Sequence, residues 1–367
     1  MDSEATTQVN IVRDQVRRWC RDTWTFDAFR EVLDGTVDPL QACWQSAAEL
    51  GLQGMSLSEA LGGSGASMDE LAAVLTETGA VAAPLAFAQS YAICRALERW
   101  GSPDQKDRYV ESLASGEQRC ALALSEPGDS SPLATGSVIY KDGLISGRKK
   151  AVPCALESRL AMVSVRMGDS LQSRLALVDL DADSCRLTRI NTIDATRRVA
   201  NIEFENADAD LLEESDVLRT VSEAATFTAL EQLGAARECL QMSVNYALER
   251  KAFGQVIGKF QAIKHKLADM YANIEIAGGN AAVALDRLDD RAGWPLHSAC
   301  ARYSAIQALE FAATETIQVH GAMGCTWESN CHLFYRRSRA LALELGAVDF
   351  WSQRIIHEFG KSAEVAV

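Results

Sequence analysis

Residues 246–270 read YALERKAFGQVIGKFQAIKHKLADM, and this stretch joins two segments that carry helical periodicity. Upstream of it, apolar residues recur at three- and four-residue steps, which predicts a long helix that ends near Arg250. A loop centred on Phe253-Gly254 follows, because glycine interrupts a helical pattern. Further helices are predicted over Gln261–Leu288, Leu296–His320 and Ala347–His357. The C-terminal part of the chain is therefore expected to be a helical bundle.

Toward the N-terminus the pattern changes twice. From Arg119 onward, short apolar runs alternate with turn residues and predict strands over Ser137–Tyr140, Leu144–Ser146, Leu160–Val165, Arg174–Val178 and Ala200–Phe204. Strands at such close spacing predict an antiparallel barrel or sandwich. Before them, from Asn10 to about Ser115, the periodicity is helical. The prediction is a mainly α fold with a central β domain: an N-terminal helical domain (1–119), a β-barrel domain (120–215) and a C-terminal helical bundle domain (216–367).

Charge and composition exclude several classes of function. The 367 residues carry 36 Lys and Arg against 50 Asp and Glu, a formal net charge of −14. So acidic a chain lacks the field that wraps nucleic acid and is repelled by an anionic membrane surface. The longest apolar stretch is far too short to span a bilayer, and residues 1–10 lack the apolar core of a signal peptide. We expect a cytoplasmic protein that binds neither nucleic acid nor membrane.

Cysteine and histidine spacing argues against a metal site and against a disulfide framework. The 10 cysteines are scattered over the chain, with no pair at Cys-x-x-Cys spacing. That distribution is typical of buried reduced thiols. The 5 histidines form no His-x-x-x-His pair. We therefore expect no metal ligands.

The stretch at 246–270 closely resembles the signature of the acyl-CoA dehydrogenase family, in which a helix ends in Glu-Arg, a Phe-Gly loop follows and the next helix opens with Phe-Gln. Other segments resemble family motifs in the same order: Glu59 to Gly65, Ser125-Glu126-Pro127-Gly128 and Gln318 to Gly324, with Glu328 and Arg336 downstream. The resemblance covers nearly the whole chain. It implies the family's fold, a helical domain, a β-barrel and a four-helix bundle, with FAD as cofactor.

Six residues resemble those that hold the ADP half of FAD in the family: Arg250, Phe253, Gln261, Gln318, Gly321 and Gly324. Arginine offers a forked donor pair to a pyrophosphate, glutamine amides donate and accept, and glycines let the backbone approach a phosphate closely. Taken singly, Arg250 also fits a helix-end charge, Phe253 a core residue, and the two glycines a helix stop. The resemblance implies that these residues grip the cofactor of a neighbouring subunit, and hence an oligomer.

The catalytic base of the family is not in register in this chain. The family's reaction needs a carboxylate that removes the α-proton of a thioester, while the β-hydrogen leaves as hydride to the flavin. Ungapped counting places Leu345 where many members have the glutamate of a Tyr-Glu-Gly-Thr turn, with Glu344 one residue before it. A second family location falls on Ala224, with Glu223 beside it. Glu344 and Glu223 are thus the candidate bases, each one residue out of register.

Residues that face the flavin ring in the family are also altered. Where the family presents Trp-Ile-Thr, this chain has Ala151-Val152-Pro153, which removes an indole, a hydroxyl and a backbone donor. Ser125 keeps the hydroxyl of the family's Thr-Glu-Pro motif. Ser131 falls where that stretch carries a serine near the substrate thioester, although an ordinary turn serine also fits. The cluster Gly147–Lys150 would suit the phosphates of coenzyme A or, alternatively, a solvated turn.

These changes are asymmetric, because the residues for the ADP half survive while those for the ring and the base are mostly lost. The pattern resembles the family's hetero-oligomeric members, in which only one of two related subunits supplies the base. It implies a subunit of an FAD-dependent dehydrogenase of an acyl-CoA, of bulky or steroid-derived type. The subunit would belong to a homo- or hetero-tetramer and pass electrons to an electron-transfer flavoprotein or another acceptor. The alternatives are a self-sufficient homo-oligomer that uses Glu344 or Glu223, a flavin-free scaffold that completes a partner's site, and an oxidase or monooxygenase variant.

Overall fold

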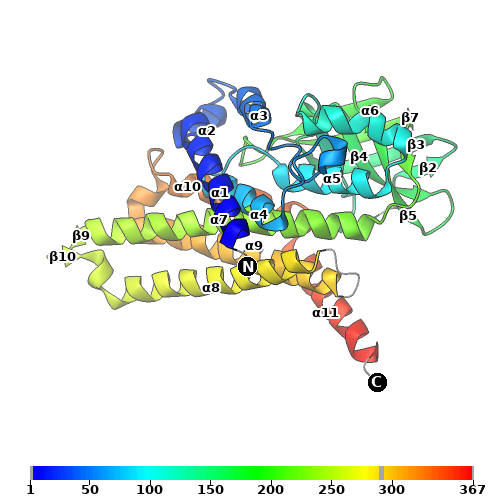
Figure 1. Cartoon of the computed structure of the whole chain (residues 1–367). Coiled ribbons are helices and arrows are strands. Elements are labelled where there is room, and N and C mark those ends of the chain that lie inside the picture. The colour runs from blue at the N-terminus through cyan, green and yellow to red at the C-terminus, as the bar shows by residue number, and fades with distance from the viewer. Residues whose placement is uncertain (1–2, 130, 135, 289–292, 366–367) are drawn as a thin grey trace.

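The computed structural model describes residues 3–129, 131–134, 136–288 and 293–365, which form a mainly helical protein with a central sheet, as predicted (Figure 1). The N-terminal part contains α1 (Ser3–Thr23), α2 (Phe26–Asp34), α3 (Leu40–Glu49), α4 (Met68–Ala80), α5 (Phe87–Trp100) and α6 (Pro103–Ala114). α4 begins at a capping box, in which the Ser67 hydroxyl accepts from the Glu70 N–H and the Glu70 carboxylate accepts from the Ser67 N–H. The cap fixes where this helix starts.

The central sheet contains β1 (Cys120–Ala123), β2 (Ile139–Lys141), β3 (Leu144–Pro153), β4 (Leu160–Met167), β5 (Ser173–Asp179), β6 (Cys185–Ile190), β7 (Val199–Asp208) and β8 (Asp210–Leu212). Their order is β6-β7-β3-β2-β4-β5-β8, and β1 pairs with β4. Most pairs are antiparallel, as the turns predicted, but β4 also takes β1 and β2 as parallel partners. The predicted strands all occur. β3 is longer than predicted, and β1, β6 and β8 were not predicted.

The C-terminal part is a bundle of α7 (Val217–Glu249), α8 (Gln261–Asp286), α9 (Trp294–His320), α10 (Cys331–Leu343) and α11 (Val348–Val365). Between α7 and α8, the predicted Phe-Gly loop forms a hairpin of β9 (Lys251–Ala252) and β10 (Gln255–Val256). Hydroxyl pairs join α7 to α9, with Thr226 Oγ1 3.0 Å from Ser298 Oγ and Ser243 Oγ 3.0 Å from Thr316 Oγ1. The bounds of α7, α8 and α9 lie close to those predicted, α11 continues beyond His357, and α10 was not predicted.

Two glycines lock the N-terminal helices onto the bundle where α4 crosses α7. A Cβ on Gly79 would lie 2.1 Å from the Glu231 carbonyl oxygen, and one on Gly234 would lie 2.0 Å from the Thr76 carbonyl oxygen. Both distances are far below a van der Waals contact, so only glycine permits this approach. The residues on either side of the crossing belong to one apolar core that runs through both helical parts. A second core lies within the sheet.

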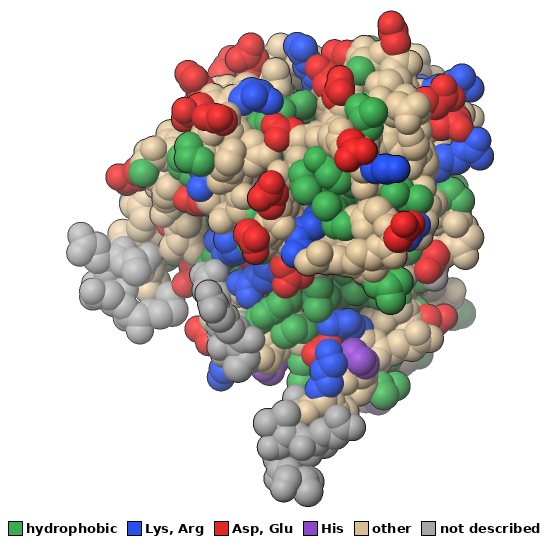
Figure 2. All heavy atoms as spheres, turned by 90° about the vertical axis from the view of Figure 1, so that its right-hand side faces the viewer, with side chains coloured by type: hydrophobic (Ala, Val, Ile, Leu, Met, Phe, Trp, Pro, Cys, Tyr) green, Lys and Arg blue, Asp and Glu red, His purple; other side chains and the backbone are tan. Residues whose placement is uncertain are grey.

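The surface carries charges of both signs. On the face drawn in Figure 2, acidic and basic side chains are interspersed between apolar patches instead of forming a field of one sign. Within the described residues, no helix is long and apolar enough to cross a membrane. The same residues contain no group of three or more His, Cys, Asp or Glu side chains that could hold a metal ion.

Candidate functional site

A cleft of about 250 Å³ opens where the β domain meets the turn between α10 and α11. We call this space the cleft. Its walls bring together residues that are far apart in sequence: Ser125 after β1, Lys150 to Pro153 on β3, and Glu344, Leu345 and Ala347 after α10. These are the positions that the sequence assigned to the flavin ring and to the base. The structure thus gathers Ser125, Glu344 and Leu345 at one place.

The turn after α10 holds the leucine that replaces the base. Glu344 leaves the helix in an extended conformation, with φ −64° and ψ 136°. Leu345 then adopts the left-handed region, with φ +58°, and Gly346 follows at φ +92°. A leucine in that region costs roughly 1–2 kcal/mol, so the surrounding packing must hold it there. Its side chain lines the cleft and has no group that accepts a proton.

A buried ion pair fixes the strand segment that carries Ser125. Lys149 is fully buried, and its ammonium group donates to Glu126 Oε1 at 2.8 Å, to the Leu124 carbonyl at 3.0 Å and to Ser164 Oγ at 2.9 Å. Burial lowers the pKa of Lys149 to about 8, against the attraction of Glu126. The interpretation of Gly147–Lys150 as a solvated turn is therefore wrong, because the segment belongs to β3 and Lys149 points into the core.

The β3 wall of the cleft offers few polar groups. A bulge interrupts the pairing of β3 with β7 between Lys149 and Val152, and Ala151 takes φ +50° there. Ala151 has no ring to present, and Pro153 has no backbone donor. Among the described residues that line the cleft, Glu344 is the one carboxylate and Ser125 the one hydroxyl.

The Glu344 carboxylate faces arginine as well as the cleft. Its Oε1 lies 3.2 Å from Arg197 Nε, and its Oε2 accepts from the Gln89 amide at 3.2 Å. Burial raises the pKa of Glu344, and the attraction of Arg197 opposes that rise only in part. A raised pKa makes a carboxylate a stronger proton acceptor. Of the two candidate bases, Glu344 is therefore the one that lines the cleft.

Behind the cleft lies a buried ionic cluster of six side chains: Asp194, Arg197, Glu231, Arg302, Arg337 and Glu344. Arg197 donates to Glu231 Oε2 at 2.9 Å, and Arg337 donates to Asp194 Oδ2 at 2.7 Å. Arg302 donates to the carbonyl of Glu344 at 2.6 Å. Three positive and three negative groups thus balance one another out of water, as buried charges require.

The cluster joins all three parts of the chain. Besides their carboxylate partners, Arg197 donates to the Leu85 carbonyl at 2.9 Å and Arg337 donates to the Ala83 carbonyl at 2.7 Å, both in the N-terminal part. These residues were not predicted from the sequence. One signal was present, because Arg302 lies on the same helical face as Ala305, Ile306 and Leu309, which are all buried. A charge on an apolar stripe indicates a buried pair.

Glu223, the other candidate base, does not line the cleft. It is fully buried on α7, where Arg99 Nη2 lies 2.9 Å and Arg219 Nε 3.0 Å from Oε1, and Arg95 Nε lies 3.3 Å from Oε2. Three guanidinium groups thus surround one buried carboxylate, as buried charges require. These ion pairs connect α5 to α7. They indicate a structural role for Glu223, which lies away from the cleft.

Ser131 is engaged within its own loop. Its hydroxyl oxygen accepts from the Leu133 N–H at 3.1 Å, and its own N–H donates to Asp129 Oδ1 at 2.8 Å. Both bonds are local turn contacts of the kind that serine and aspartate make. The geometry fits the turn interpretation of Ser131, and its assignment to the substrate stays a prediction.

The six residues assigned to the ADP half lie together at one end of the bundle, and we call them the bundle-end residues: Arg250, Phe253, Gln261, Gln318, Gly321 and Gly324. Arg250 follows the last residue of α7, and Gln261 opens α8. Stacking of Tyr246 on His320, with 4.2 Å between ring centroids, joins the C-terminal ends of α7 and α9. Figure 1 shows this end, marked by β9 and β10, on the side away from the sheet.

The bundle-end residues are open to solvent. Phe253 exposes 96% of its surface and holds φ +50°, an unusual conformation for a residue with a side chain. Arg250, Gln261 and Gln318 are exposed, and their side chains make no hydrogen bond or ion pair within the described part of the chain. Gly324 is buried, and a Cβ there would lie 2.7 Å from the Ile317 carbonyl oxygen. This end presents side-chain donors that have no partner in the described part of the chain. It also presents the Phe253 ring, which meets the Phe260 ring edge-on at 6.2 Å and is otherwise open to solvent.

The cleft and the bundle end are far apart. Glu231, in the ionic cluster behind the cleft, and Arg250 are separated by about 19 positions on α7, or roughly 28 Å at 1.5 Å per residue. The two sets of residues therefore cannot hold the same part of one small molecule.

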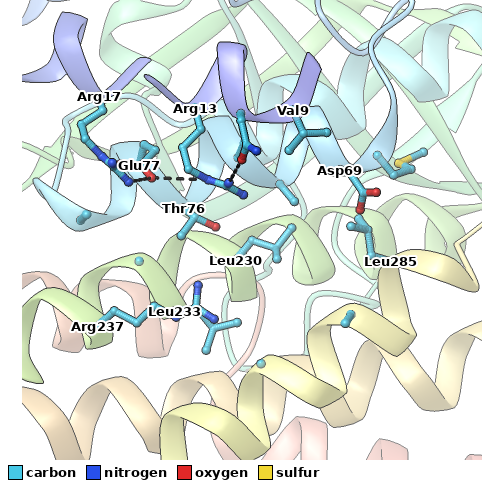
Figure 3. A pocket seen from close by; sticks show the side chains of 18 of the residues that line it. Val9, Arg13, Arg17, Asp69, Thr76, Glu77, Leu230, Leu233, Arg237 and Leu285 are labelled. Atoms are coloured by element: carbon cyan, nitrogen blue, oxygen red, sulfur yellow. Dashed lines mark hydrogen bonds and ion pairs between the residues drawn. The ribbon is translucent and has the colours of Figure 1, made fainter. Parts of the chain in front are cut away.

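A larger groove, of about 950 Å³, lies between α1, α4, α7 and α8 (Figure 3). Arg17 Nη2 lies 2.8 Å from Glu77 Oε1, and Arg13 Nε lies 3.8 Å from the same oxygen. Glu238 also lines the groove, and burial raises its pKa to about 7. Among the described residues that line the groove there is no residue assigned from the sequence to the base or the cofactor. Size alone therefore does not identify the site.

Comparison with known proteins agrees with the arrangement of helices, sheet and bundle. The chain matches the family models "Acyl-CoA dehydrogenase, N-terminal domain" over residues 6–117 and "Acyl-CoA dehydrogenase, C-terminal domain" over residues 216–358. Benzylmalonyl-CoA dehydrogenase from Aromatoleum aromaticum is 30% identical over 295 residues, which cover 76% of this chain and 78% of that protein. The chain belongs to the acyl-CoA dehydrogenase family.

Further members of the acyl-CoA dehydrogenase family are similar to this one. The acyl-CoA dehydrogenase IpdE2 of Mycobacterium tuberculosis is 39% identical over 176 residues, 46% of this chain and 52% of IpdE2. The chain spans about half the length of the curated relatives that it matches first. A solved structure described as "Tcur3481-Tcur3483 steroid ACAD G363A variant" matches with a TM-score of 0.91 and 26% identity, over 98% of this chain and 99% of that one.

As acyl-CoA dehydrogenases are FAD flavoproteins, the family supplies a reason for two separate sets of residues. A flavin ring needs a flat wall and a few donors, whereas a pyrophosphate needs cationic and N–H donors. The cleft is lined by the residues that the sequence associates with the ring, and the bundle end offers donors of the second kind.

Proposed function

We propose that this chain is one subunit of an FAD-dependent acyl-CoA dehydrogenase, and that its bundle-end residues complete the ADP half of a cofactor whose ring and catalytic base belong to a related subunit. The assembly introduces an α,β double bond into an acyl-CoA of bulky or steroid-derived type and passes the electrons to an electron-transfer flavoprotein or another acceptor. The substrate class rests on the similarity to the steroid acyl-CoA dehydrogenase structure.

One observation carries the proposal. Arg250 and Gln318 are exposed and unpaired in the described chain, and Phe253 is held at φ +50° with its ring in solvent. Natural proteins keep such strained, exposed groups where a ligand or partner covers them. The cleft of the same chain lacks a base at Leu345. A shared site explains both features, because each subunit then needs only one of the two sets.

The residues present fit one half of FAD better than the other. At the bundle end, the forked guanidinium of Arg250 and the amide of Gln318 suit a pyrophosphate and a ribose. In the cleft, Pro153 supplies no donor and Ala151 no ring. The volume of about 250 Å³ also falls below the roughly 300–1,000 Å³ of most small-ligand pockets. A flavin ring and a thioester together would need more space than the described cleft provides.

The chemistry of this chain follows from that fit. When FAD is bound in the assembly, its ring supplies the acceptor for the hydride that leaves the β-carbon. Arg250 neutralises part of the pyrophosphate charge, Gln261 and Gln318 donate to its oxygens or the ribose, and Phe253 covers an apolar surface of the cofactor. The α-proton goes to a carboxylate of the related subunit. This chain's contribution is to bind and orient.

The test is flavin stoichiometry with and without a partner. The chain is purified alone and after co-expression with a related acyl-CoA dehydrogenase subunit, and bound FAD is measured by absorbance. We expect little flavin on the chain alone and about half a flavin per chain in the joint complex. Arg250→Gln should lower the flavin content of the complex, because it removes a charged donor to the pyrophosphate.

Lys251→Gln is the matched control, since Lys251 is the adjacent exposed cation on β9 and is not assigned to the cofactor. Equal flavin loss in both variants would indicate a general charge effect and contradict the assignment of Arg250. One tightly bound flavin per chain in the lone protein, reduced by an acyl-CoA, would overturn the shared site. A colourless joint complex would favour the flavin-free scaffold.

A self-sufficient enzyme is the second candidate, and one observation favours it. Glu344 is a cleft-lining residue, and burial raises the pKa of its carboxyl, as suits a general base. If Glu344 is the base, Glu344→Gln should reduce turnover by roughly 10²–10⁴-fold. If the related subunit supplies the base, the same variant in the joint complex should keep its turnover within a few-fold. Glu223→Gln, away from the cleft, tests the other candidate in the same assay.

A further inference from the structure

The groove of about 950 Å³ between α1, α4, α7 and α8 shares no lining residue with the cleft and contains none of the bundle-end residues. Its volume falls within the roughly 300–1,000 Å³ of most small-ligand pockets. None of the described residues that line it was assigned to the flavin, the base or the thioester. A ligand of the groove is therefore a different molecule, or a different part of one, from the ligands of those two regions.

The floor of the groove lies where α4 crosses α7. Thr76 of α4 and Gly234 of α7 both line the groove, and a Cβ on Gly234 would lie 2.0 Å from the Thr76 carbonyl oxygen. The two helices therefore meet backbone to backbone at this point. Leu230 and Leu233, which also line the groove, are buried beside the crossing. Core packing thus fixes the floor before any ligand arrives, as is usual for a ligand site.

The groove has a charged end and an apolar end, and Figure 3 shows them on opposite sides of the view. Glu77 and Arg237 lie toward the left, whereas Val9 and Leu285 lie toward the right. Along α7, Arg237 and Leu230 are about seven positions apart, or roughly 10 Å at 1.5 Å per residue. An occupant that reaches from one end to the other is therefore elongated.

At the charged end, the guanidinium groups differ in what they contact. Arg17 Nε and Nη2 donate to the two oxygens of Glu77 at 2.9 and 2.8 Å. Arg13 Nη1 donates to Asn10 Oδ1 at 2.7 Å, and Arg13 Nε lies 3.8 Å from Glu77. Arg237, by contrast, makes no hydrogen bond or ion pair within the described part of the chain. Its donors are available to a ligand.

The surroundings of Arg237 hold its charge at the groove. A Cβ on Gly278 of α8 would lie 3.5 Å from Arg237 Nη2, so the guanidinium group lies between α7 and α8, both of which line the groove. Glu238 is the next residue, and burial raises its pKa to about 7. Below that pH the Glu238 carboxyl is mostly neutral and does not cancel the charge of Arg237.

The other end of the groove combines apolar walls with carboxylates. Val9, Leu230 and Leu285 are buried apolar residues of this end. Asp69 and Asp286 also line the groove here, and both are exposed. These two carboxylates repel an anion, whereas Arg237 attracts one. The charges therefore orient a ligand that carries one anionic group, with that group at Arg237.

We propose that the groove binds an elongated amphipathic carboxylate, whose anionic head accepts hydrogen bonds from Arg237 and whose apolar body lies along Leu230, Leu233 and Leu285. A guanidinium group offers a carboxylate two parallel hydrogen bonds, and burial of the apolar body adds affinity in proportion to its area. On a chain whose formal net charge is −14, an anion needs such a local cation. The inference does not rest on the shared-site function, because it needs neither flavin nor partner.

The experiment is isothermal titration calorimetry of the full chain with decanoate, below its critical micelle concentration and at pH 6. At this pH decanoate is ionised, since ordinary carboxyl groups have pKa values of roughly 4, and Glu238 is mostly neutral. We expect saturable binding of one decanoate per chain. Decanol, which has the same tail without the charge, should bind about tenfold more weakly. Propionate, which has the charge without the tail, should show no saturable binding over the same range.

Two variants test the two ends of the groove. Arg237→Gln should weaken decanoate binding by about three- to tenfold, because it removes the charged donor. Arg18→Gln is its matched control, since Arg18 is an exposed arginine of α1 that does not line the groove. Ala282→Phe fills the apolar end from α8 and should abolish saturable binding. Its control is Ala272→Phe, at an exposed alanine of the same helix outside the groove.

Both controls should leave the affinity unchanged, and circular dichroism shows that each variant folds. Decanoate binding that weakens in the two groove variants alone supports the inference. Three outcomes overturn it: no saturable binding to the folded chain, equal affinity for decanol, and an equal loss in Arg18→Gln, which would indicate a general charge effect.

One further outcome concerns a different occupant. Decanoate binding could disappear as the chain concentration rises, while sedimentation velocity shows a dimer that Ala282→Phe dissociates. A second copy of the chain would then occupy the groove, and the inference of a small carboxylate ligand would be wrong.

Discussion

Behind the cleft, charged side chains are buried and paired, whereas at the bundle end Arg250 is exposed with no partner in the described chain. Both regions use guanidinium groups. Behind the cleft, the guanidinium groups of Arg197 and Arg337 donate hydrogen bonds to carboxylates and carbonyls of the same chain. At the bundle end, the guanidinium group of Arg250 donates no hydrogen bond within the described residues, so its donors are open to solvent. The same residue type thus holds the fold in one place and is available for binding in the other.

The turn after α10 shows that the fold can hold a backbone conformation whatever side chain the turn carries. The turn at Leu345 and Gly346 retains positive φ values even though a leucine now occupies the first of them. The buried ionic cluster holds Glu344 on one side of that turn. Because the cluster also joins the N-terminal part to the bundle, stability alone would preserve it. At the bundle end no such structural demand is visible among the described residues, and this is why we propose that a partner or ligand covers the exposed groups.

The largest effect is expected from Arg197→Met. Removing this guanidinium leaves the carboxylates of Glu231 and Glu344 buried without their shared partner. Breaking one side of a buried ion pair typically costs about 3–5 kcal/mol. We expect a loss of that order in the free energy of unfolding, measured by urea denaturation.

Arg159→Met makes the same chemical change on the surface, where Arg159 Nη2 lies 3.5 Å from Asp179. It should cost no more than about 1 kcal/mol. Similar losses in the two variants would show that the buried ionic cluster does not stabilise the fold more than a surface pair, and would remove one side of the comparison.

The two regions also differ in how far the sequence predicts them. The helices around the 246–270 stretch follow local periodicity, so the bounds of α8 and α9 were predicted closely. The bundle-end residues lie in or beside such helices and are gathered by two helix ends and a hairpin, which makes their grouping accessible from sequence. Strand β6 was missed because Arg186, Thr188 and Arg189 make it resemble a solvated segment.

The cleft depends on contacts between distant parts of the chain. Lys149 was interpreted as solvated because it stands in a Gly-Arg-Lys-Lys run, yet its partner Glu126 lies 23 residues away and buries it. The ionic cluster joins Asp194 and Arg197, which follow β6, to residues of α7, α9 and α10 and the turn after it. No local pattern reports such an assembly. The count that placed Leu345 at the base position could name the residue but not its left-handed turn.

A smaller effect is expected in the pH dependence of stability, through Glu344. Burial raises the pKa of this carboxyl above its ordinary value of 4.5. A group whose pKa is higher in the folded chain than in the unfolded chain stabilises the fold when protonated. That contribution is complete below pH 4.5 and is lost as the pH rises through the folded value. Glu344→Gln should remove this loss.

The contribution of Glu344 is measured by urea denaturation at a series of pH values from 4 upward. The quantity compared is the difference in unfolding free energy between Glu344→Gln and the unmodified chain. The difference should shift in favour of the variant as the pH rises. Glu249→Gln, an exposed carboxyl at the bundle end, should show no such trend. A difference for Glu344→Gln that stays flat over the whole range would mean that Arg197 fully offsets burial at the cleft.

The smallest effect on stability, and the most informative at the bundle end, concerns Phe253. Its side chain is 96% exposed, so truncation removes almost no buried surface, while φ +50° strains any residue that has a Cβ. Phe253→Ala keeps the Cβ and should change the free energy of unfolding by less than about 0.5 kcal/mol. Phe253→Gly relieves the strain and should stabilise the chain by up to about 1 kcal/mol, less the added entropy of its unfolded state.

Both variants remove the ring, so both should weaken flavin retention in the joint complex equally. If Phe253→Gly retains more flavin than Phe253→Ala, in line with its higher stability, then flavin retention depends on the stability of the loop and not on the ring. The exposed phenylalanine would then have a structural role, like the buried charges behind the cleft.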